Sequence, residues 1–171
     1  MNLLQTITKG YTKQNCEKVV QWIGSNKNRF SALMDLVLHA DARISQRAAW
    51  PMSYCVIKFQ DLVKPWFGQI VDLLEKKDTH PALIRNIVRL LQKVDIPKRY
   101  QGRIMNACFG FVQSNDQPPA IKAFSLTILE NLSKQYPETR QELKIIIEER
   151  WTREKAAFRS RARKIINTIK I

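Results

Sequence analysis

The chain has 171 residues and a mass of 20.0 kDa, which is enough to bury a hydrophobic core and favours a single domain over residues 1–171. Hydrophobic residues make up 44% of the sequence and only 5 residues are glycine, which excludes a disordered or linker-like chain. Lysine and arginine total 29 against 15 aspartates and glutamates, and the resulting net charge of +14 favours an acidic partner.

Two features predict a soluble, cytoplasmic protein. The apolar run in MNLLQTITKG is too short for a signal peptide, and no stretch approaches the ~18 apolar residues that span a membrane. Cys16, Cys55 and Cys108 form no CxxC pair and have no neighbouring histidine, so we expect reduced, buried thiols. The sequence predicts no bound metal and no cofactor.

Apolar residues that recur every three or four positions predict helices throughout the chain. In chain order we expect a leading helix near 12–24 and then four helix pairs: 27–40 with 42–62, 65–77 with 80–95, 98–114 with 117–136, and 138–150 with 153–170. Six prolines fall at the predicted starts or joints, which suits a residue without an amide hydrogen. Pro51 lies inside the helix 42–62 and is expected to kink it.

The paired helices share an internal repeat. Arg47, Arg85, Lys122 and Arg159 follow one another at separations of 38, 37 and 37 residues. An aspartate precedes each of the first three by six or seven residues, at Asp41, Asp78 and Asp116. Apolar residues also recur beside them, and on this pattern Ile84, Ile87, Ile121, Phe124 and Phe158 are predicted to be buried.

This pattern resembles the HEAT and armadillo class of α-solenoids, over roughly residues 27 to 171. The resemblance implies an all-α, right-handed superhelix of about four helical hairpins plus an N-terminal helix. It also implies that the second helices line a concave surface. The last repeat departs from the pattern, because no aspartate precedes Arg159 at the expected offset and Arg161 replaces the apolar residue found as Ala49, Ile87 and Phe124.

The repeated basic residues have two interpretations. In the structural one, Arg47, Arg85 and Lys122 bond to the aspartates of the turns and tie the repeats together. In the functional one, three pairs spaced by four residues each lie on one face of a helix and form a basic stripe for a polyanion: Arg43 with Arg47, Arg85 with Arg89, and Arg159 with Arg163.

Trp50 and Tyr54 continue the face of Arg43 and Arg47. Aromatic rings beside guanidinium groups can stack on a base or on a cation, although Trp50 can equally belong to the core between helices. The candidate anion- or partner-binding residues are therefore Arg43, Arg47, Trp50, Tyr54, Arg85, Arg89, Lys122, Arg159 and Arg163.

The sequence predicts binding rather than catalysis. His39 and His80 are isolated near helix ends, and no phosphate-binding glycine loop or nucleophile motif is present. The leading expectation is a non-enzymatic binding or scaffold module for a protein or other extended partner. The alternative is a nucleic-acid-binding module. Within it, a DNA-glycosylase-like enzyme is the less favoured version, because the catalytic residues of such enzymes cannot be matched onto this chain. The oligomeric state stays open.

The segment AAFRSRARKIINTIKI, residues 156 to 171, poses the same choice at the end of the chain. It is either a solvated terminal helix or part of a polyanion-binding surface. Terminal repeats are commonly atypical because their outer side meets water, which favours the first interpretation.

Overall fold

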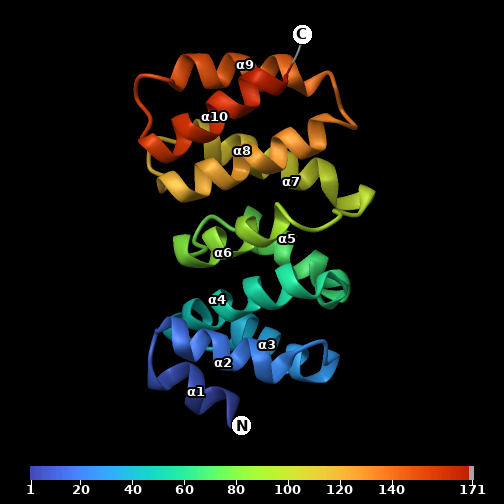
Figure 1. Ribbon diagram of the computed structural model, residues 1–171, viewed down its shortest axis with the longest axis vertical. Coiled ribbons are helices and arrows are strands. Elements are labelled where there is room, and N and C mark those ends of the chain that lie inside the picture. Colours follow the sequence, from blue (N-terminus) through green and yellow to red (C-terminus); the bar gives the residue numbers. More distant parts are fainter. Residues whose placement is uncertain (170–171) are drawn as a thin grey trace. The chain divides into compact units, whose positions relative to one another are not determined.

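A computed structural model describes residues 1–169 and contains ten α-helices, one short 3-10 helix and no strand within that range (Figure 1). Lys170 and the end of the last predicted helix lie outside the described residues. The chain divides into two compact units, Met1–Val94 and Asp95–Ile171. The prediction of an all-α fold built from paired helices is confirmed.

The first unit contains six α-helices: α1 (Leu3–Lys9), α2 (Lys13–Ile23), α3 (Lys27–His39), α4 (Ala42–Lys58), α5 (Phe67–Glu75) and α6 (Pro81–Leu91), with the 3-10 helix η1 (Gln60–Trp66) before α5. Helix α4 is its centre, because α1, α2, α3 and α6 all pack against it. The residues of α4 that face these neighbours are small or flexible, and Ala48, Ala49, Met52 and Cys55 are completely buried. Close packing of helices on several sides favours such side chains.

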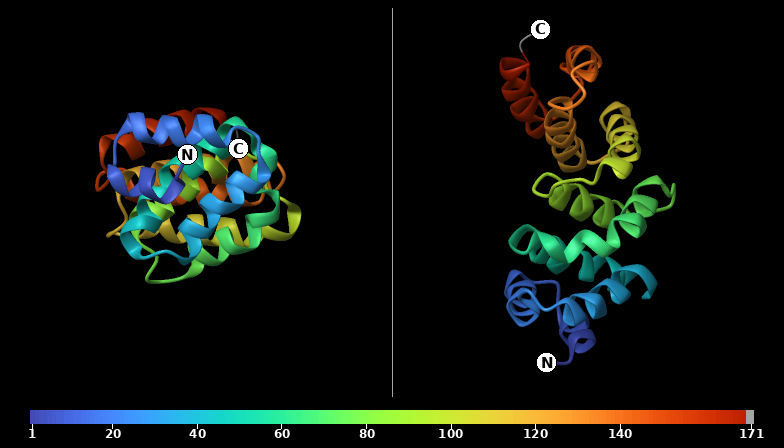
Figure 2. Two further views of the ribbon diagram at one scale, coloured as in Figure 1. Left: turned by 90° about the horizontal axis from the view of Figure 1, so that it is seen from below. Right: turned by 90° about the vertical axis from the view of Figure 1, so that its right-hand side faces the viewer.

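The second unit contains α7 (Lys98–Gln113), α8 (Pro119–Ser133), α9 (Thr139–Arg150) and α10 (Ala156–Thr168). Helix α8 packs against α7, α9 and α10, and Figure 2 shows α7 and α8 lying side by side. Ile104, Ile121, Leu129 and Phe158 are among the side chains that fill the core between these helices. Each unit therefore buries its apolar face around one central second helix.

The predicted boundaries differ from the structure mainly at two places. The helix 42–62 is split, since α4 ends at Lys58, Phe59 leaves the helical conformation with φ −136° and ψ 80°, and a 3-10 turn follows. Helix α6 stops at Leu91, not residue 95, and a turn follows before α7 begins after Pro97. Pro51 lies inside α4, which continues as helix on both sides of it.

Helix α1 was not predicted. Its seven residues begin after Asn2, whose side chain accepts a hydrogen bond from the backbone amide of Gln5 at 3.0 Å, and Ile7 is buried. A helix this short has little stability on its own, so it depends on tertiary contacts that periodicity does not reveal.

Candidate functional site

Arg43 and Arg47 lie on the first half of α4, but their side chains have different surroundings. Arg43 is exposed. The guanidinium of Arg47 donates a 2.7 Å hydrogen bond to the carbonyl of Thr8, in the last turn of α1. A cation at the C-terminal end of a helix satisfies carbonyl groups that lack partners within that helix. Arg47 therefore ties α1 to α4 and has less freedom to meet a ligand than Arg43.

The described residues do not form the ladder of aspartate–arginine pairs that the structural interpretation supposes. Asp41 instead caps α4, accepting 3.0 Å hydrogen bonds from the backbone amides of Arg43 and Ile44. Asp78 lies 3.7 Å from Lys76 in the same turn. Lys122 pairs with Glu154 and not with Asp116. The structural interpretation was wrong about the partner of Arg47, because Asp41 satisfies free backbone amides at the start of α4 and the guanidinium of Arg47 bonds to Thr8.

Arg85 and Arg89 lie on α6 and are both half-buried. Arg89 donates a 2.7 Å hydrogen bond to the side-chain oxygen of Asn86, and its guanidinium carbon lies 5.7 Å from the centre of the Tyr54 ring. Asn86 is completely buried and also accepts a 3.3 Å bond from Ser53 of α4. The structure thus brings Arg89 and Tyr54 together across α4 and α6. The buried Nε of Arg85 has no hydrogen-bond partner among the described residues.

Trp50 and Tyr54 border an open groove of about 410 Å³ between α2 and α4, which we term the aromatic groove. Its lining residues are Lys13, Cys16, Glu17, Val20, Gln21, Trp50, Tyr54, Ile57 and Lys58. The Tyr54 side chain is 45% exposed, whereas Trp50 is half-buried and packs on Tyr11 at a ring distance of 4.8 Å. Trp50 is thus neither a full core residue nor a free platform: it forms a wall of the groove.

The cysteines give this groove no nucleophile at neutral pH. Burial raises the pKa of the Cys16 thiol from 9.0 to about 11, and Glu17 beside it adds to the rise. Cys55 and Cys108 are also buried free thiols, as predicted. Since the thiolate is the reactive form, these side chains behave as small apolar residues.

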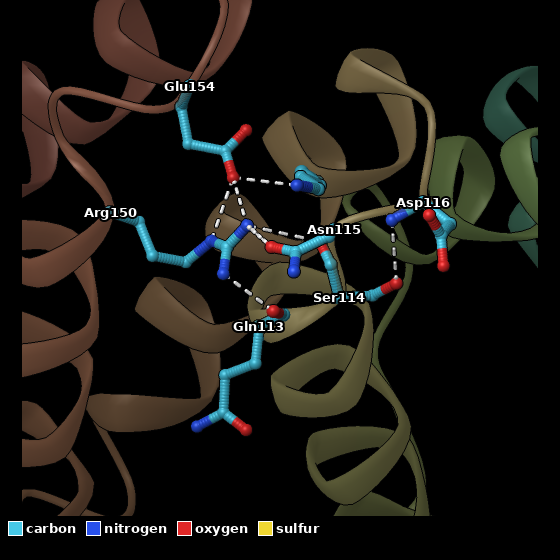
Figure 3. A network of polar contacts seen from close by, with 7 residues as sticks. Gln113, Ser114, Asn115, Asp116, Arg150 and Glu154 are labelled. Atoms are coloured by element: carbon cyan, nitrogen blue, oxygen red, sulfur yellow. Dashed lines mark hydrogen bonds and ion pairs between the residues drawn. The ribbon is translucent and has the colours of Figure 1, made fainter.

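Lys122 lies inside the second unit and is only 3% exposed. Its Nζ donates a 2.6 Å hydrogen bond to Oε1 of Glu154. Arg150 donates to the same oxygen through its Nε at 2.7 Å (Figure 3). Arg150 also donates to the carbonyl of Gln113 at 2.6 Å. Lys122 is thus buried and shares Glu154 with Arg150, which separates it from the exposed Arg43, Arg159 and Arg163.

Sequence reasoning missed Glu154 and Arg150, although a signal for Glu154 was present. Glu154 follows Asp116 by 38 residues and therefore continues the register of Asp41, Asp78 and Asp116. The register position is acidic in all four repeats, but it is a glutamate in the last one. Lys122 does tie successive repeats together, as the structural interpretation supposed, but through the acid of the following repeat.

The basic residues of α10 divide between two sides of the helix. Successive residues turn by about 100°, which places Arg159 and Arg163 on one side and Arg161 and Lys164 on another. Phe158, Ala162 and Ile165 form the third side and are completely buried. Arg159 and Arg163 are exposed, and the guanidinium of Arg163 lies 5.9 Å from the centre of the Trp151 ring. Helix α10 therefore packs against the core through one side and carries exposed positive charge on another.

Residues 1–169 contain no group of three or more histidine, cysteine, aspartate or glutamate side chains placed to hold a metal ion. None of the described helices has the combination of length and apolarity that crossing a bilayer requires. His80 accepts a 3.0 Å hydrogen bond from the amide of Ala82 through Nδ1 and so caps α6. This arrangement agrees with a capping role for that histidine.

Comparison with protein families gives one result that covers almost the whole chain. A family model described as a HEAT repeat domain matches residues 3–169. Searches of curated proteins and of solved structures found no match. The match extends over both units and agrees with their stacked helical pairs, and the chain therefore belongs to the HEAT repeat domain family.

Proposed function

We propose that this protein is a non-enzymatic binding module that recognises a protein or another extended partner through the surface of its second helices. HEAT repeats form helical scaffolds that typically mediate protein interactions. Stacked repeats present long open surfaces and few enclosed cavities, which suits binding better than chemistry. The proposal includes a cytoplasmic location, which the three free, buried thiols support.

The aromatic groove is the observation that carries this proposal. Tyr54 and Ile57 of α4 and Val20 of α2 supply apolar surface, while Lys13, Glu17 and Lys58 place charges at its edges. Protein interfaces combine an apolar, aromatic centre with a polar rim in this way, and tyrosine and tryptophan dominate their energetics. The contact of Arg89 with Tyr54 holds one wall in place from the neighbouring helix.

Affinity capture with matched variants tests the proposal. Immobilised wild-type protein, Tyr54→Ser and Ile145→Ser are incubated with native extract, with and without nuclease. Ile145 is the control because it is an exposed apolar residue, 43% accessible, on α9 and outside the groove. We expect a protein that survives nuclease treatment to bind wild type and Ile145→Ser but not Tyr54→Ser. Equal capture by all three folded proteins, or no nuclease-resistant partner, contradicts the proposal.

Nucleic-acid binding is the second candidate, and the charge on α10 is the observation that favours it. Residues 156 to 168 include Arg159, Arg161, Arg163 and Lys164 and no acidic residue. Binding to phosphates releases counterions, so the affinity for duplex DNA or RNA should fall with salt at a log–log slope of about −0.9 per phosphate. Lys122 is not part of this candidate surface, since it is buried and paired with Glu154.

A double variant distinguishes this candidate from a solvated terminal helix. If Arg159 and Arg163 meet phosphates, Arg159→Gln with Arg163→Gln should weaken binding evenly across sequences and reduce the salt slope by up to about 2. Fluorescence anisotropy at several salt concentrations measures both quantities, and thermal unfolding of the same samples verifies that the variant is folded. Unchanged affinity in the folded variant contradicts the phosphate-binding role of this pair.

A further inference from the structure

A second groove lies within the second unit, between α8 and α10, and has a volume of about 320 Å³. We term it the basic groove; its lining residues are Ala120, Ala123, Phe124, Ala157, Ser160, Arg161 and Lys164. Three alanines and the Phe124 ring provide apolar surface. Arg161 and Lys164 are the two charged residues of this lining, and both are cationic.

The repeat register explains why this groove is open. Ala49 of α4 and Ile87 of α6 occupy one register position and are both completely buried. Phe124 and Arg161 occupy the same position in α8 and α10 but are only half-buried. Arginine keeps its guanidinium group in water while its aliphatic stem lies on apolar surface. Arg161, which replaces the apolar residue of the other repeats, therefore lines an apolar groove and adds a cation to it.

The positive charge of the groove is not neutralised within the described residues. Neither Arg161 nor Lys164 forms an ion pair there, and α10 has no acidic residue. Glu130 of α8, which lies further along the helix, accepts a 2.9 Å hydrogen bond from Thr168. Ala157, Arg161 and Lys164 are spaced by four and three residues and so share one side of α10. Their side differs from that of Arg159 and Arg163.

We propose that the basic groove binds an acidic peptide segment of a partner protein, with one apolar side chain placed against the alanines and Phe124. Carboxylates next to this anchor pair with Arg161, which can bind a carboxylate through two hydrogen bonds, and with Lys164. Charge complementarity selects this occupant, because an apolar or basic segment would leave both cations without partners. The site is separate from the aromatic groove and extends the proposed function to a second contact.

The lining favours a peptide over a nucleic acid. Proteins hold single strands by stacking bases on exposed aromatic rings along a continuous basic channel. Here the one aromatic ring, Phe124, is half-buried, and the remaining apolar surface comes from alanine methyl groups that fit an aliphatic or aromatic side chain. Nucleic-acid binding at this groove is therefore the competing outcome in the experiment that follows.

Selection from a random 12-residue peptide library displayed on phage tests the proposal on the full chain. The matched variants are Arg161→Gln with Lys164→Gln, which removes the charge of the groove, and Arg159→Gln with Arg163→Gln, which removes equal charge from another side of the same helix. Ala157→Phe, a change at an exposed position, fills the groove without loss of charge. Circular dichroism and thermal unfolding verify that each variant is folded.

We expect the selected peptides to be enriched in aspartate and glutamate around one apolar residue. Their affinity, measured by fluorescence anisotropy, should fall at least tenfold in the Arg161/Lys164 variant and in Ala157→Phe, and less than threefold in the Arg159/Arg163 variant. Three results overturn the proposal: no selected peptide, peptides without acidic enrichment, or equal loss in both charge variants. It is also overturned if a 20-nucleotide poly(dT) strand, and no peptide, depends on Arg161 and Lys164. Tyr54→Ser should leave peptide binding intact, so failure here is distinguishable from failure at the aromatic groove.

Discussion

Glu154 accepts hydrogen bonds from two cations in the interior of the second unit, and the stability of that network depends on it. Removal of a shared acid leaves a buried cation without a partner, whereas removal of one cation leaves the acid still paired. The Nζ of Lys122 lies 2.6 Å from Glu154, and Arg150 retains bonds to Gln113 and Asn115 when the acid is absent. Loss of Glu154 should therefore lower the stability more than loss of Lys122 does.

We predict that Glu154→Ala lowers the free energy of unfolding by about 3–5 kcal/mol. Lys122→Met should lower it by about 1–2 kcal/mol, because methionine fills similar volume and Glu154 keeps Arg150. Urea denaturation of both variants measures the difference. Glu149→Ala, an exposed acid on the preceding helix α9, is the control and should change stability by about half a kilocalorie or less. A Glu154→Ala variant as stable as this control would mean that the buried network contributes little.

The three thiols provide a second test at this scale. Burial raises the pKa of Cys55 and of Cys108 to about 12, and that of Cys16 to about 11. A folded-state pKa above the unfolded value means that the folded protein holds the proton more tightly. The associated stability is thus fully present below pH 9 and is lost as the pH rises from 9 towards 11–12.

We therefore predict that native protein at pH 8 reacts with Ellman's reagent much more slowly than unfolded protein, in which all three thiols react at once. Cys16 should react before the others, since it lines the aromatic groove and is 7% exposed while Cys55 and Cys108 are completely buried. Absorbance at the thionitrobenzoate band follows the reaction. Rapid titration of all three thiols in the folded protein would show that the core opens far more readily than its packing indicates.

The repeat register predicted burial at four of five single positions. Ile84, Ile87, Ile121 and Phe158 are buried, as the register predicted. Phe124 is half-buried, so that prediction was wrong, because its neighbour in the next repeat is Arg161 and not an apolar residue. Periodicity identifies the side of a helix that faces a neighbour. It does not identify the residue of the neighbouring helix that packs against that side.

At the scale of helices, the sequence predicts nine of the ten α-helices of residues 1–169. The missed helix and the misplaced end of α4 have different causes. The short helix α1 is bonded to Arg47, which is distant in sequence, and α4 ends where the backbone of Phe59 leaves the helical conformation. Among the candidate site residues, spacing places Arg43, Trp50 and Tyr54 on one helix correctly. It gives no indication of Tyr11 or of the α2 residues that complete the aromatic groove.

The helix starts also differ in a way that mutagenesis can measure. Asp41 caps α4 through two backbone amides, whereas the cap of α6 is His80 and not Asp78. We predict that Asp41→Ala lowers the free energy of unfolding by about 1 kcal/mol, a common effect of losing a helix cap. Asp78→Ala is the matched control from the same register of the repeat and should lie within about half a kilocalorie of wild type. Equal effects in urea denaturation would mean that the repeated aspartates share one role after all.

At the scale of the whole molecule, stability depends on cooperativity between the two units. The family match spans both, and the length of the chain favours one domain. In repeat proteins, stability is approximately the sum of the stabilities of the repeats and of the interfaces between neighbours. If the chain is a single domain, a substitution that destabilises one unit must also destabilise the other.

We predict that Phe158→Ala, in the second unit, lowers the unfolding midpoint reported from the first. Phe158 is completely buried, and truncation of such a side chain removes about 3–5 kcal/mol. Trp151→Phe leaves Trp22, Trp50 and Trp66 as fluorescent probes, all within Met1–Val94. In the Trp151→Phe background, the fluorescence and circular dichroism midpoints in urea should coincide and should shift together when Phe158 is truncated. An unchanged fluorescence midpoint beside a two-step circular dichroism curve would mean that the two units unfold as separate domains.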